Sequence, residues 1–180
     1  TMSTLSVNTI TAETGNTVSL ASGKTLDASQ GFTAPAGHVI QFVKSPSILT
    51  AGITTTSNNP TEISTGLRVT ITPKSTSSTI VWMMMGNFVT AAVSHAGMDV
   101  RRSINGGSYS DITTGNGNEA FRQRGGETDQ RQGTIIYYNQ PNTTQSVVYT
   151  PYFWTNSGSN GFIINDNGMG TFCIAMEISG

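Results

Sequence analysis

The residues best suited to catalysis are Ser94, His95 and Asp99, which lie close together in the sequence. A hydroxyl, an imidazole and a carboxylate can form a hydrolytic triad when each lies within hydrogen-bond reach of the next. The surrounding sequence predicts a strand, on which His95 and Asp99 are about 13 Å apart at about 3.3 Å per residue. That distance excludes a proton relay unless the strand breaks at Gly97, and no G-x-S-x-G nucleophile elbow occurs. We expect His95, like His38, to be a structural or surface histidine, and we predict no catalytic residue.

Carboxylates in a glycine-rich stretch could perform glycoside hydrolysis. Glu119, Glu127 and Asp129 lie in that stretch, and a glycosidase needs two such groups about 5–9.5 Å apart. Nothing in the sequence fixes this separation, and Arg122 and Arg124 alternate with the acids. The mixture is typical of a self-neutralising solvated loop. A glycan depolymerase is therefore an alternative that we rank below a binding protein.

Metal and redox chemistry have little support. The segment NDNG (Asn165–Gly168) is similar to the start of a calcium loop but lacks its bidentate glutamate, so we expect a hairpin turn. No His/Cys cluster has zinc-ligand spacing. The single cysteine, Cys173, alternates with bulky apolar neighbours, which predicts a buried, inert thiol. We predict no metal site, no cofactor and no enzymatic activity.

Long polar loops with embedded aromatic residues favour binding, and sugars are the ligands that they suit. Tyr109 and Trp154 could stack on a pyranose ring while amide side chains bind its hydroxyl groups. Packing of Trp154 with Tyr152 and Val148 on one strand face is the alternative. The candidate ligand-binding residues are Tyr109, Asn116, Arg122, Arg124, Trp154 and Asn156.

The elements that must position these residues are strands with a two-residue period. They recur about a dozen residues apart with Gly/Asn/Ser turns between them, and no ten-residue stretch keeps a helical period. This pattern predicts an all-β fold, with an antiparallel β-sandwich or jelly-roll knob over residues 38–180. The expected strands span residues 39–43, 67–72, 79–88, 98–104, 133–138, 145–154, 161–164 and 170–178.

The expected strand 79–88 (TIVWMMMGNF) is apolar on both faces. Val81, Met83 and Met85 share one face, and Trp82 lies on the other. A strand of an antiparallel sandwich normally turns one face to water. We therefore expect a second subunit to cover the additional apolar face.

Arg102 interrupts an apolar row that Met98, Val100 and Ile104 form on the next strand. A guanidinium in such a row needs a carboxylate or several carbonyl groups. We expect that partner at or near a subunit interface. The alternative is an edge strand from which the arginine reaches solvent.

The sequence pattern of residues 1–30 predicts a connector that cannot fold alone. Its short apolar strand segments are separated by turn-forming residues, and a lone two-stranded ribbon is marginal in water. We expect the connector to intertwine with identical copies or to dock on a larger assembly, and residues 31–37 (GFTAPAG) to form a hinge. The candidate subunit-interface residues are Leu5, Val7, Val18, Leu20, Val81, Met83, Met85 and Arg102.

The composition narrows the possible partners. Charged residues are 11% of the chain and the net charge is −1, so we expect no nucleic-acid partner, which would require many phosphate contacts. The longest apolar stretch, Ile80–Met85, is far shorter than the roughly 20 residues of a membrane-spanning helix. No signal-peptide pattern opens the chain, so we expect a location outside a cell to be reached on a particle or by lysis.

Two sequence segments resemble the N-terminal region of small virion proteins from tailed phages, many of them marine or cyanobacterial. The two segments are MSTLSVNTITAETGNTVSLASGKTLDAS and GFTAPAGHVIQ. Further along the chain, TGLRVTITP and the closing MEI are also similar to segments of these virion proteins. Roughly residues 95–160 carry none of the resemblance. It implies a homotrimeric fibre, spike or decoration protein, assembled in the host cytoplasm and exposed on the virion. A start at Met2 favours a short fibre, a fibre tip or a capsid appendage.

The resemblance also implies partners. The N-terminal segment would bind other virion proteins, and the knob would serve host adhesion or surface decoration, with a host-surface glycan as a candidate ligand. A free carbohydrate-binding module is the alternative from another class.

Overall fold

The computed structural model describes residues 22–23, 35–90, 95–113, 121–124, 129–156, 161–165 and 168–180. The chain divides into two compact units, Thr1–Thr33 and Ala34–Gly180. The expectations for the connector 1–30, with Leu5, Val7, Val18 and Leu20, fall outside the described residues, as does the expectation for Asn116. The predicted domain boundaries stay predictions.

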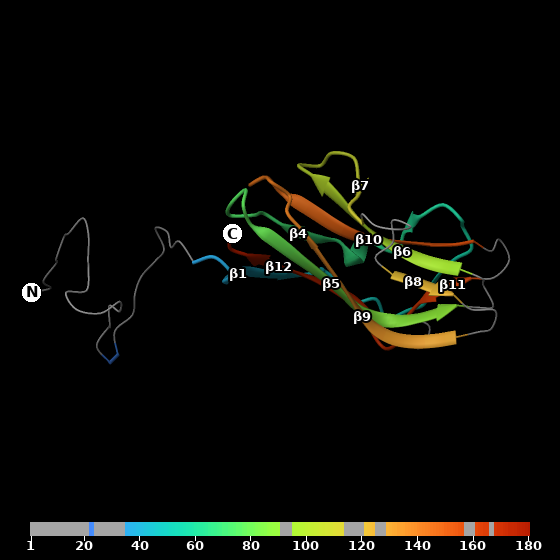
Figure 1. Ribbon diagram of the computed structural model, residues 1–180. Coiled ribbons are helices and arrows are strands. Elements are labelled where there is room, and N and C mark those ends of the chain that lie inside the picture. The colour runs from blue at the N-terminus through green and yellow to red at the C-terminus, as the bar shows by residue number, and fades with distance from the viewer. Residues whose placement is uncertain are drawn as a thin grey trace, which may run out of the picture. The chain divides into compact units, whose positions relative to one another are not determined.

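The described part of the second unit is built from β-strands and one short 3-10 helix (Figure 1). In chain order the elements are β1 (Val39–Lys44), β2 (Ile53–Thr55), β3 (Thr61–Glu62), η1 (Thr65–Leu67), β4 (Val69–Ile71), β5 (Thr79–Thr90), β6 (His95–Ile104), β7 (Ser110–Asp111), β8 (Phe121–Arg124), β9 (Asp129–Asn139), β10 (Val147–Thr155), β11 (Phe162–Ile164) and β12 (Phe172–Ile178). The prediction of an all-β fold with antiparallel sheets is confirmed.

The long strand β5 organises one antiparallel sheet, which we call the β5 sheet. Along one side, β5 pairs with β9 from Ile80 to Thr90. Along its other side it pairs with β12 and then with β11, and these two strands pair in turn with β1 and β2. No strand in the described part of the chain pairs with the far side of β9, so β9 is an edge strand.

Strands β6 and β10 form the centre of the second antiparallel sheet, the β6 sheet. They pair over nine residues, from Ala96 opposite Thr155 to Ile104 opposite Val147. β3 and β4 flank β10, while β7 and β8 flank β6. In Figure 1 the layer with β10, β6 and β7 lies above the layer with β12, β5 and β9.

The two layers share one hydrophobic core. β5 contributes Trp82, Met84 and Phe88, and β10 contributes Tyr149 and Phe153, all of them buried. Each large apolar side chain buried in this way contributes about 1.5–3 kcal/mol. Cys173 is also fully buried in the core, as predicted, and burial strongly raises the pKa of its thiol.

Each expected strand overlaps an observed one, but two local predictions are wrong. Leu67 ends η1 instead of starting a strand, because the side chain of Ser64 caps that turn by accepting from the Gly66 N–H. Asn165 and Gly168 both have positive φ, and the Gly168 N–H donates to the Asn165 carbonyl at 3.4 Å. The segment between them does not join a hairpin, because β11 and β12 pair successively with the same side of β5 and not with each other.

The side chain of Asn165 explains that arrangement. It is fully buried, its Nδ2 donates to the Leu49 carbonyl at 2.8 Å, and its Oδ1 accepts from the Gly170 N–H at 3.0 Å. The Asn165 N–H also donates to the Asn87 carbonyl of β5 at 2.9 Å, so the end of β11 is held beside β5 while the Asn165 side chain is tied to Leu49 and Gly170.

Candidate functional site

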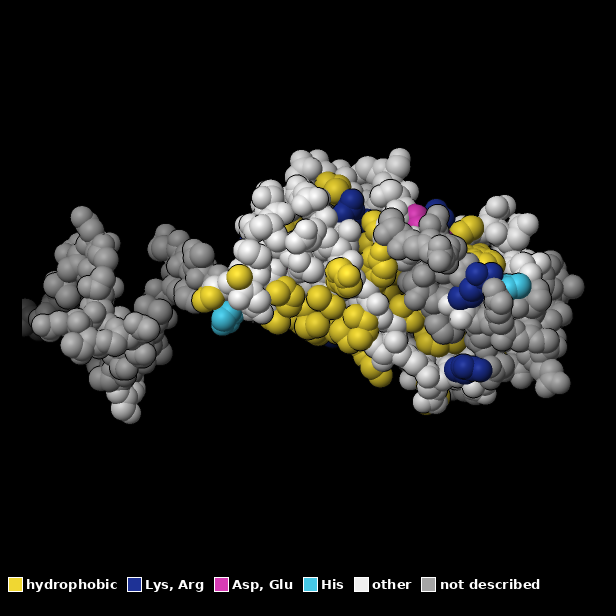
Figure 2. Space-filling view, viewed as in Figure 1, with side chains coloured by type: hydrophobic (Ala, Val, Ile, Leu, Met, Phe, Trp, Pro, Cys, Tyr) yellow, Lys and Arg dark blue, Asp and Glu magenta, His cyan; other side chains and the backbone are white. Residues whose placement is uncertain are grey.

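The outer face of the β5 sheet is an exposed apolar surface. The register of the strands places Tyr138, Val81 and Met176 in one row across β9, β5 and β12, and Ile136, Met83 and Ile174 in the next row on the same face. We call this surface the apolar face, and it comprises Phe42, Val81, Met83, Met85, Ile136, Tyr138, Phe172, Ile174 and Met176. Figure 2 shows hydrophobic side chains gathered in a continuous band along the lower side of the second unit.

Exposure rises towards the edges of the apolar face. Tyr138 is 76% exposed and Ile136 60% on β9, and Phe42 is 59% exposed on β1. Val81 and Met83 on the central strand are half-buried by their neighbours, while Met85 is 50% exposed. The doubly apolar pattern of residues 79–88 thus corresponds to one face in the core and one face that the described part of the chain leaves open.

A hollow deepens the apolar face beside β1. It has a volume of about 370 Å³, and its walls include Phe42, Pro46, Ile48, Phe172 and Ile174. Lys44 contributes to the same hollow. A large apolar side chain from a partner would fit against such a surface.

The outer face of the β6 sheet has a different chemistry, with alternating aromatic and charged side chains. Arg101 lies over the ring of Tyr152 at 4.4 Å, and Arg68 lies over the ring of Tyr109 at 5.3 Å. The two tyrosine rings are 6.4 Å apart. Arg68 also forms a two-point ion pair with Glu62, at 2.6 and 2.7 Å, and this pair lowers the pKa of the Glu62 carboxyl.

Trp154 extends that face beyond Tyr152. It lies opposite Gly97 in the β10–β6 register, and a Cβ on Gly97 would come within 2.7 Å of the indole. The absence of a side chain at Gly97 therefore lets the indole lie against the β6 backbone. Trp154 is half-buried on the sheet's outer face and does not belong to the core, so both the stacking and the packing interpretations of this residue stay open.

Three further predicted ligand-binding residues are Asn156, Arg122 and Arg124. The side chain of Asn156 contacts His95: its Oδ1 accepts from the His95 N–H at 2.9 Å, and its Nδ2 lies 3.2 Å from the His95 Nδ1. Arg122 is exposed on β8. The side chain of Arg124 lies outside the described part of the structure, although its backbone belongs to β8.

Arg102 lies at the open edge between the two sheets. Its Nη1 donates to the Asn139 Oδ1 at 2.6 Å, and the same oxygen accepts from the Tyr149 hydroxyl at 3.1 Å. Its strand, β6, lies between β10 and β7/β8 and is not an edge strand, so the edge-strand alternative is wrong. The partners that the described chain supplies are neutral, namely the Asn139 amide and the Tyr149 hydroxyl, whereas the sequence predicted a carboxylate or several carbonyls.

The geometry removes the triad hypothesis. β6 runs through Gly97 without a break, so His95 and Asp99 are four residues apart on one extended strand. Asp99 is buried and lies 3.6 Å from the Arg101 guanidinium. His38 is exposed, with its Nδ1 3.1 Å from the Pro35 carbonyl oxygen.

The residues that the structure describes contain no group of three or more His, Cys, Asp or Glu side chains that could hold a metal ion. Within the same residues, no helix is long and apolar enough to cross a membrane.

Sequence reasoning missed the residues that make the apolar face extensive. Ile136 and Tyr138 share a strand face in GTIIYY, and Phe42 lies on the outward side of β1. Alternation within these strands could have identified their faces, but only the pairing of β9 and β1 around β5 and β12 shows that the faces join. No protein-family model matches the chain, and no curated protein sequence matches it.

Proposed function

We propose that this chain is a structural protein of a phage particle that assembles as a homotrimer by covering its apolar face. In this proposal it forms a short fibre, a fibre tip or a capsid appendage, exposed on the virion after assembly in the host cytoplasm. Its second unit is a jelly-roll or sandwich knob for host adhesion or surface decoration. The observation that carries the assembly is the exposed apolar face of the β5 sheet.

The size of the apolar face supports a macromolecular partner. Four strands about 4.8 Å apart, each contributing about seven residues, give a flat area of roughly 400 Å². The largest apolar patch on a typical monomer is about 300–600 Å², and patches of this size are often functional. Continuous exposure of this face in water would favour aggregation, particularly beside the edge of β9 with which no described strand pairs.

A ring of three copies can cover such a surface. The apolar face and the β9 edge are different surfaces, so contact between the face of one copy and the edge of the next is heterologous. Heterologous contacts either close into a ring or continue as a filament. The number three comes from the resemblance to trimeric phage virion proteins.

The N-terminal segment completes this proposal. Residues 1–30, including Leu5, Val7, Val18 and Leu20, would intertwine with the other copies or dock on other virion proteins. Three knobs held together would convert weak glycan contacts into useful avidity.

Native mass spectrometry of the purified protein tests the assembly. We expect the mass of three chains at micromolar concentration, and slower hydrogen exchange in β9 and β12 than in a monomeric variant. A clean monomer at that concentration would remove the proposal. Deletion of residues 1–30 should leave a soluble knob that no longer joins the particle, whereas retained incorporation would assign attachment to the knob.

The aromatic and charged outer face of the β6 sheet favours a second candidate function, a carbohydrate-binding module. A free module of this kind would be a folded monomer that binds glycans through Tyr109, Tyr152 or Trp154. The glycan depolymerase alternative requires loss of activity in Glu119→Gln or Asp129→Asn. Native mass and glycan-cleavage assays separate the three functions.

A further inference from the structure

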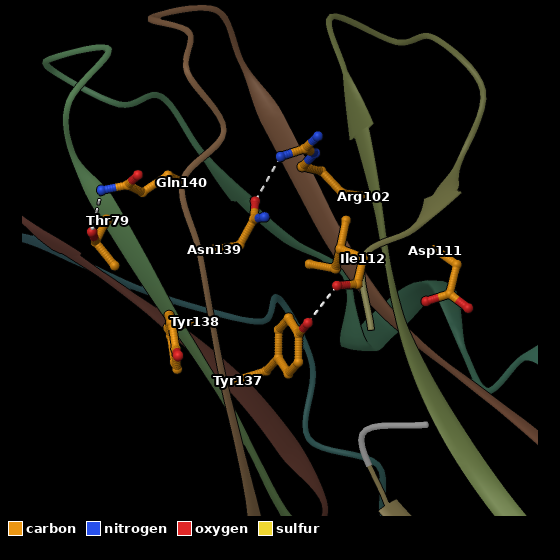
Figure 3. A pocket seen from close by; sticks show the side chains of 8 residues that line it. All are labelled: Thr79, Arg102, Asp111, Ile112, Tyr137, Tyr138, Asn139 and Gln140. Atoms are coloured by element: carbon orange, nitrogen blue, oxygen red, sulfur yellow. Dashed lines mark hydrogen bonds between the residues drawn. The ribbon is translucent and has the colours of Figure 1, made fainter. Parts of the chain in front are cut away.

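A cavity of about 740 Å³ lies at the edge where the two sheets separate (Figure 3). Its walls come from β5, β6, β7 and β9, together with Ile112 and Gln140. Small-molecule sites typically measure about 300–1,000 Å³. The cavity is therefore large enough for a small ligand, and it differs from the apolar face in being lined largely by groups that form hydrogen bonds.

The one cation among the lining residues is Arg102, and its contacts within the described chain are neutral. Its Nη1 donates to the Asn139 Oδ1, and its Nε is buried without a hydrogen-bond partner. Figure 3 shows the guanidinium of Arg102 and the amide of Asn139 directed toward each other across the gap between β6 and β9. A guanidinium has five N–H donors, so this environment satisfies only part of its capacity.

The one acid among the described residues that line the cavity does not balance that charge. Asp111 lines the same cavity, but its carboxylate accepts from the Thr113 N–H at 2.8 Å and from the Thr113 hydroxyl, and it forms no ion pair with Arg102. A half-buried cation that has no counter-charge among the described residues is costly to keep. A ligand carboxylate would compensate it, and the planar guanidinium can bind a carboxylate through two parallel hydrogen bonds.

The remaining wall groups suit hydroxyl groups on a compact ring. Gln140 and Thr79 are joined by a 3.3 Å hydrogen bond at one side of the cavity. On the opposite side, the Tyr137 hydroxyl donates to the Ile112 carbonyl, which leaves the tyrosine ring and the Ile112 side chain as an apolar wall. Asp111 lies opposite Arg101 in the β6–β7 register, so its carboxylate belongs to the outer face of the β6 sheet and is directed away from Arg102.

We propose that this cavity binds one acidic sugar unit of a surface glycan, with the sugar carboxylate on Arg102 and its hydroxyl groups on Asn139 and Gln140. This inference rests on the proposed adhesion function for its biological meaning and names the ligand class of that function. The site is formed within a single copy, so its binding chemistry does not require the trimer.

Titration calorimetry and saturation-transfer NMR with the intact chain test the proposal. The probes are the methyl glycosides of glucuronic acid, galacturonic acid and N-acetylneuraminic acid, each compared with its uncharged methyl ester. We expect at least one acid to bind, and its ester to bind about tenfold to a hundredfold more weakly, because a hydrogen-bonded charge is lost. Absence of binding by all three acids, or equal binding of acid and ester, would overturn the proposal.

The variants assign that binding to the cavity. Arg102→Gln keeps a donor for Asn139 but removes the charge, so it should weaken binding of the acid to the level of the ester. Lys74→Gln is the matched control, since it also removes one positive charge, from an exposed residue in the β4–β5 connection that does not line the cavity. Unchanged acid binding in Arg102→Gln, or equal losses in both variants with folding intact, would refute the site.

Native mass measured on the same samples separates this proposal from the assembly. A trimer that binds none of the acids overturns only the sugar site, whereas a monomer that binds an acid through Arg102 overturns only the trimer. A third result is that Arg102→Gln dissociates the trimer and no acid binds the native protein. That result would assign Arg102 to a carboxylate of the neighbouring copy and overturn the sugar proposal.

Discussion

Replacing Ile136 with lysine should dissociate the proposed trimer without unfolding the chain. Ile136 is 60% exposed at the centre of β9 and lies opposite Met83 on β5. Its side chain therefore contributes little to the core of a single copy but faces any partner that covers the apolar face. The variant separates assembly from folding more cleanly than Met83→Lys or Val81→Lys, whose side chains are already half-buried within the chain.

The expected magnitude follows from the exposed fraction of the side chain. Full burial of an isoleucine contributes about 1.5–3 kcal/mol, so burial of the exposed part contributes about 1–2 kcal/mol per copy. Three copies then lose about 3–5 kcal/mol per trimer, which weakens association between about one hundredfold and a few thousandfold. This is a lower bound, because a lysine held in the interface must also extend its charge to water.

Sedimentation equilibrium over a range of protein concentrations measures the change, with circular dichroism as the check on folding. Thr70→Lys is the matched control: Thr70 is exposed in β4 of the other sheet, so this variant should stay trimeric. If Ile136→Lys and the unmodified chain form equally stable trimers, the apolar face is not the interface. If Ile136→Lys instead unfolds, the side chain stabilises the single copy more than its exposure implies.

Three further predictions concern stability. Glu62→Gln should lower the free energy of unfolding at neutral pH by about 0.5–1 kcal/mol, a value discounted for solvent screening because the Arg68 side chain is 37% exposed. Because folding lowers the pKa of Glu62 from 4.5, the stability difference between the two proteins should be constant above about pH 4.5 and shrink as the pH falls through the folded-state pKa. Urea unfolding at a series of pH values measures this difference. Gly97→Ala should destabilise the fold by about 1–3 kcal/mol and shift tryptophan emission, because the new Cβ displaces the Trp154 ring; an unchanged spectrum and melting temperature would contradict this contact. Glu177→Ala should lower the free energy of unfolding in denaturant by about 1–3 kcal/mol, because the fully buried Glu177 carboxylate accepts from the Lys74 N–H at 2.6 Å. Glu177→Gln should cost less, because its amide oxygen can still accept that bond. Equal losses in the two variants would show that the bond is unimportant.

Much of the fold and part of the candidate site could be predicted from local sequence patterns. Alternation placed Trp82 in the core and Val81 and Met83 on the opposite face, because successive side chains of a strand point to opposite sides of its sheet. The same reasoning separated His95 from Asp99 and buried Cys173. These predictions depend on backbone geometry within one strand.

Other predictions failed because they depended on the neighbours of a strand. The sequence leaves an edge strand open as the alternative for Arg102, but β6 is flanked by β10 on one side and by β7 and β8 on the other. The turn at Asn165–Gly168 was assigned to a hairpin, yet β11 and β12 share one side of β5. In both places the local sequence predicts the conformation of the chain, but it does not predict which strands pair with each other.

The sequence by itself determined that this protein is built from β-strands, and it determined which side chains share a strand face. Only the tertiary structure decided that Ile136, Tyr138 and Phe42 join the outward residues of β5 in one apolar face. It also decided that Arg102 meets Asn139 beside a cavity. The physical reason is that side-chain direction is set by the covalent geometry of neighbouring residues, whereas strand order is set by hydrogen bonds and packing between segments far apart in the chain.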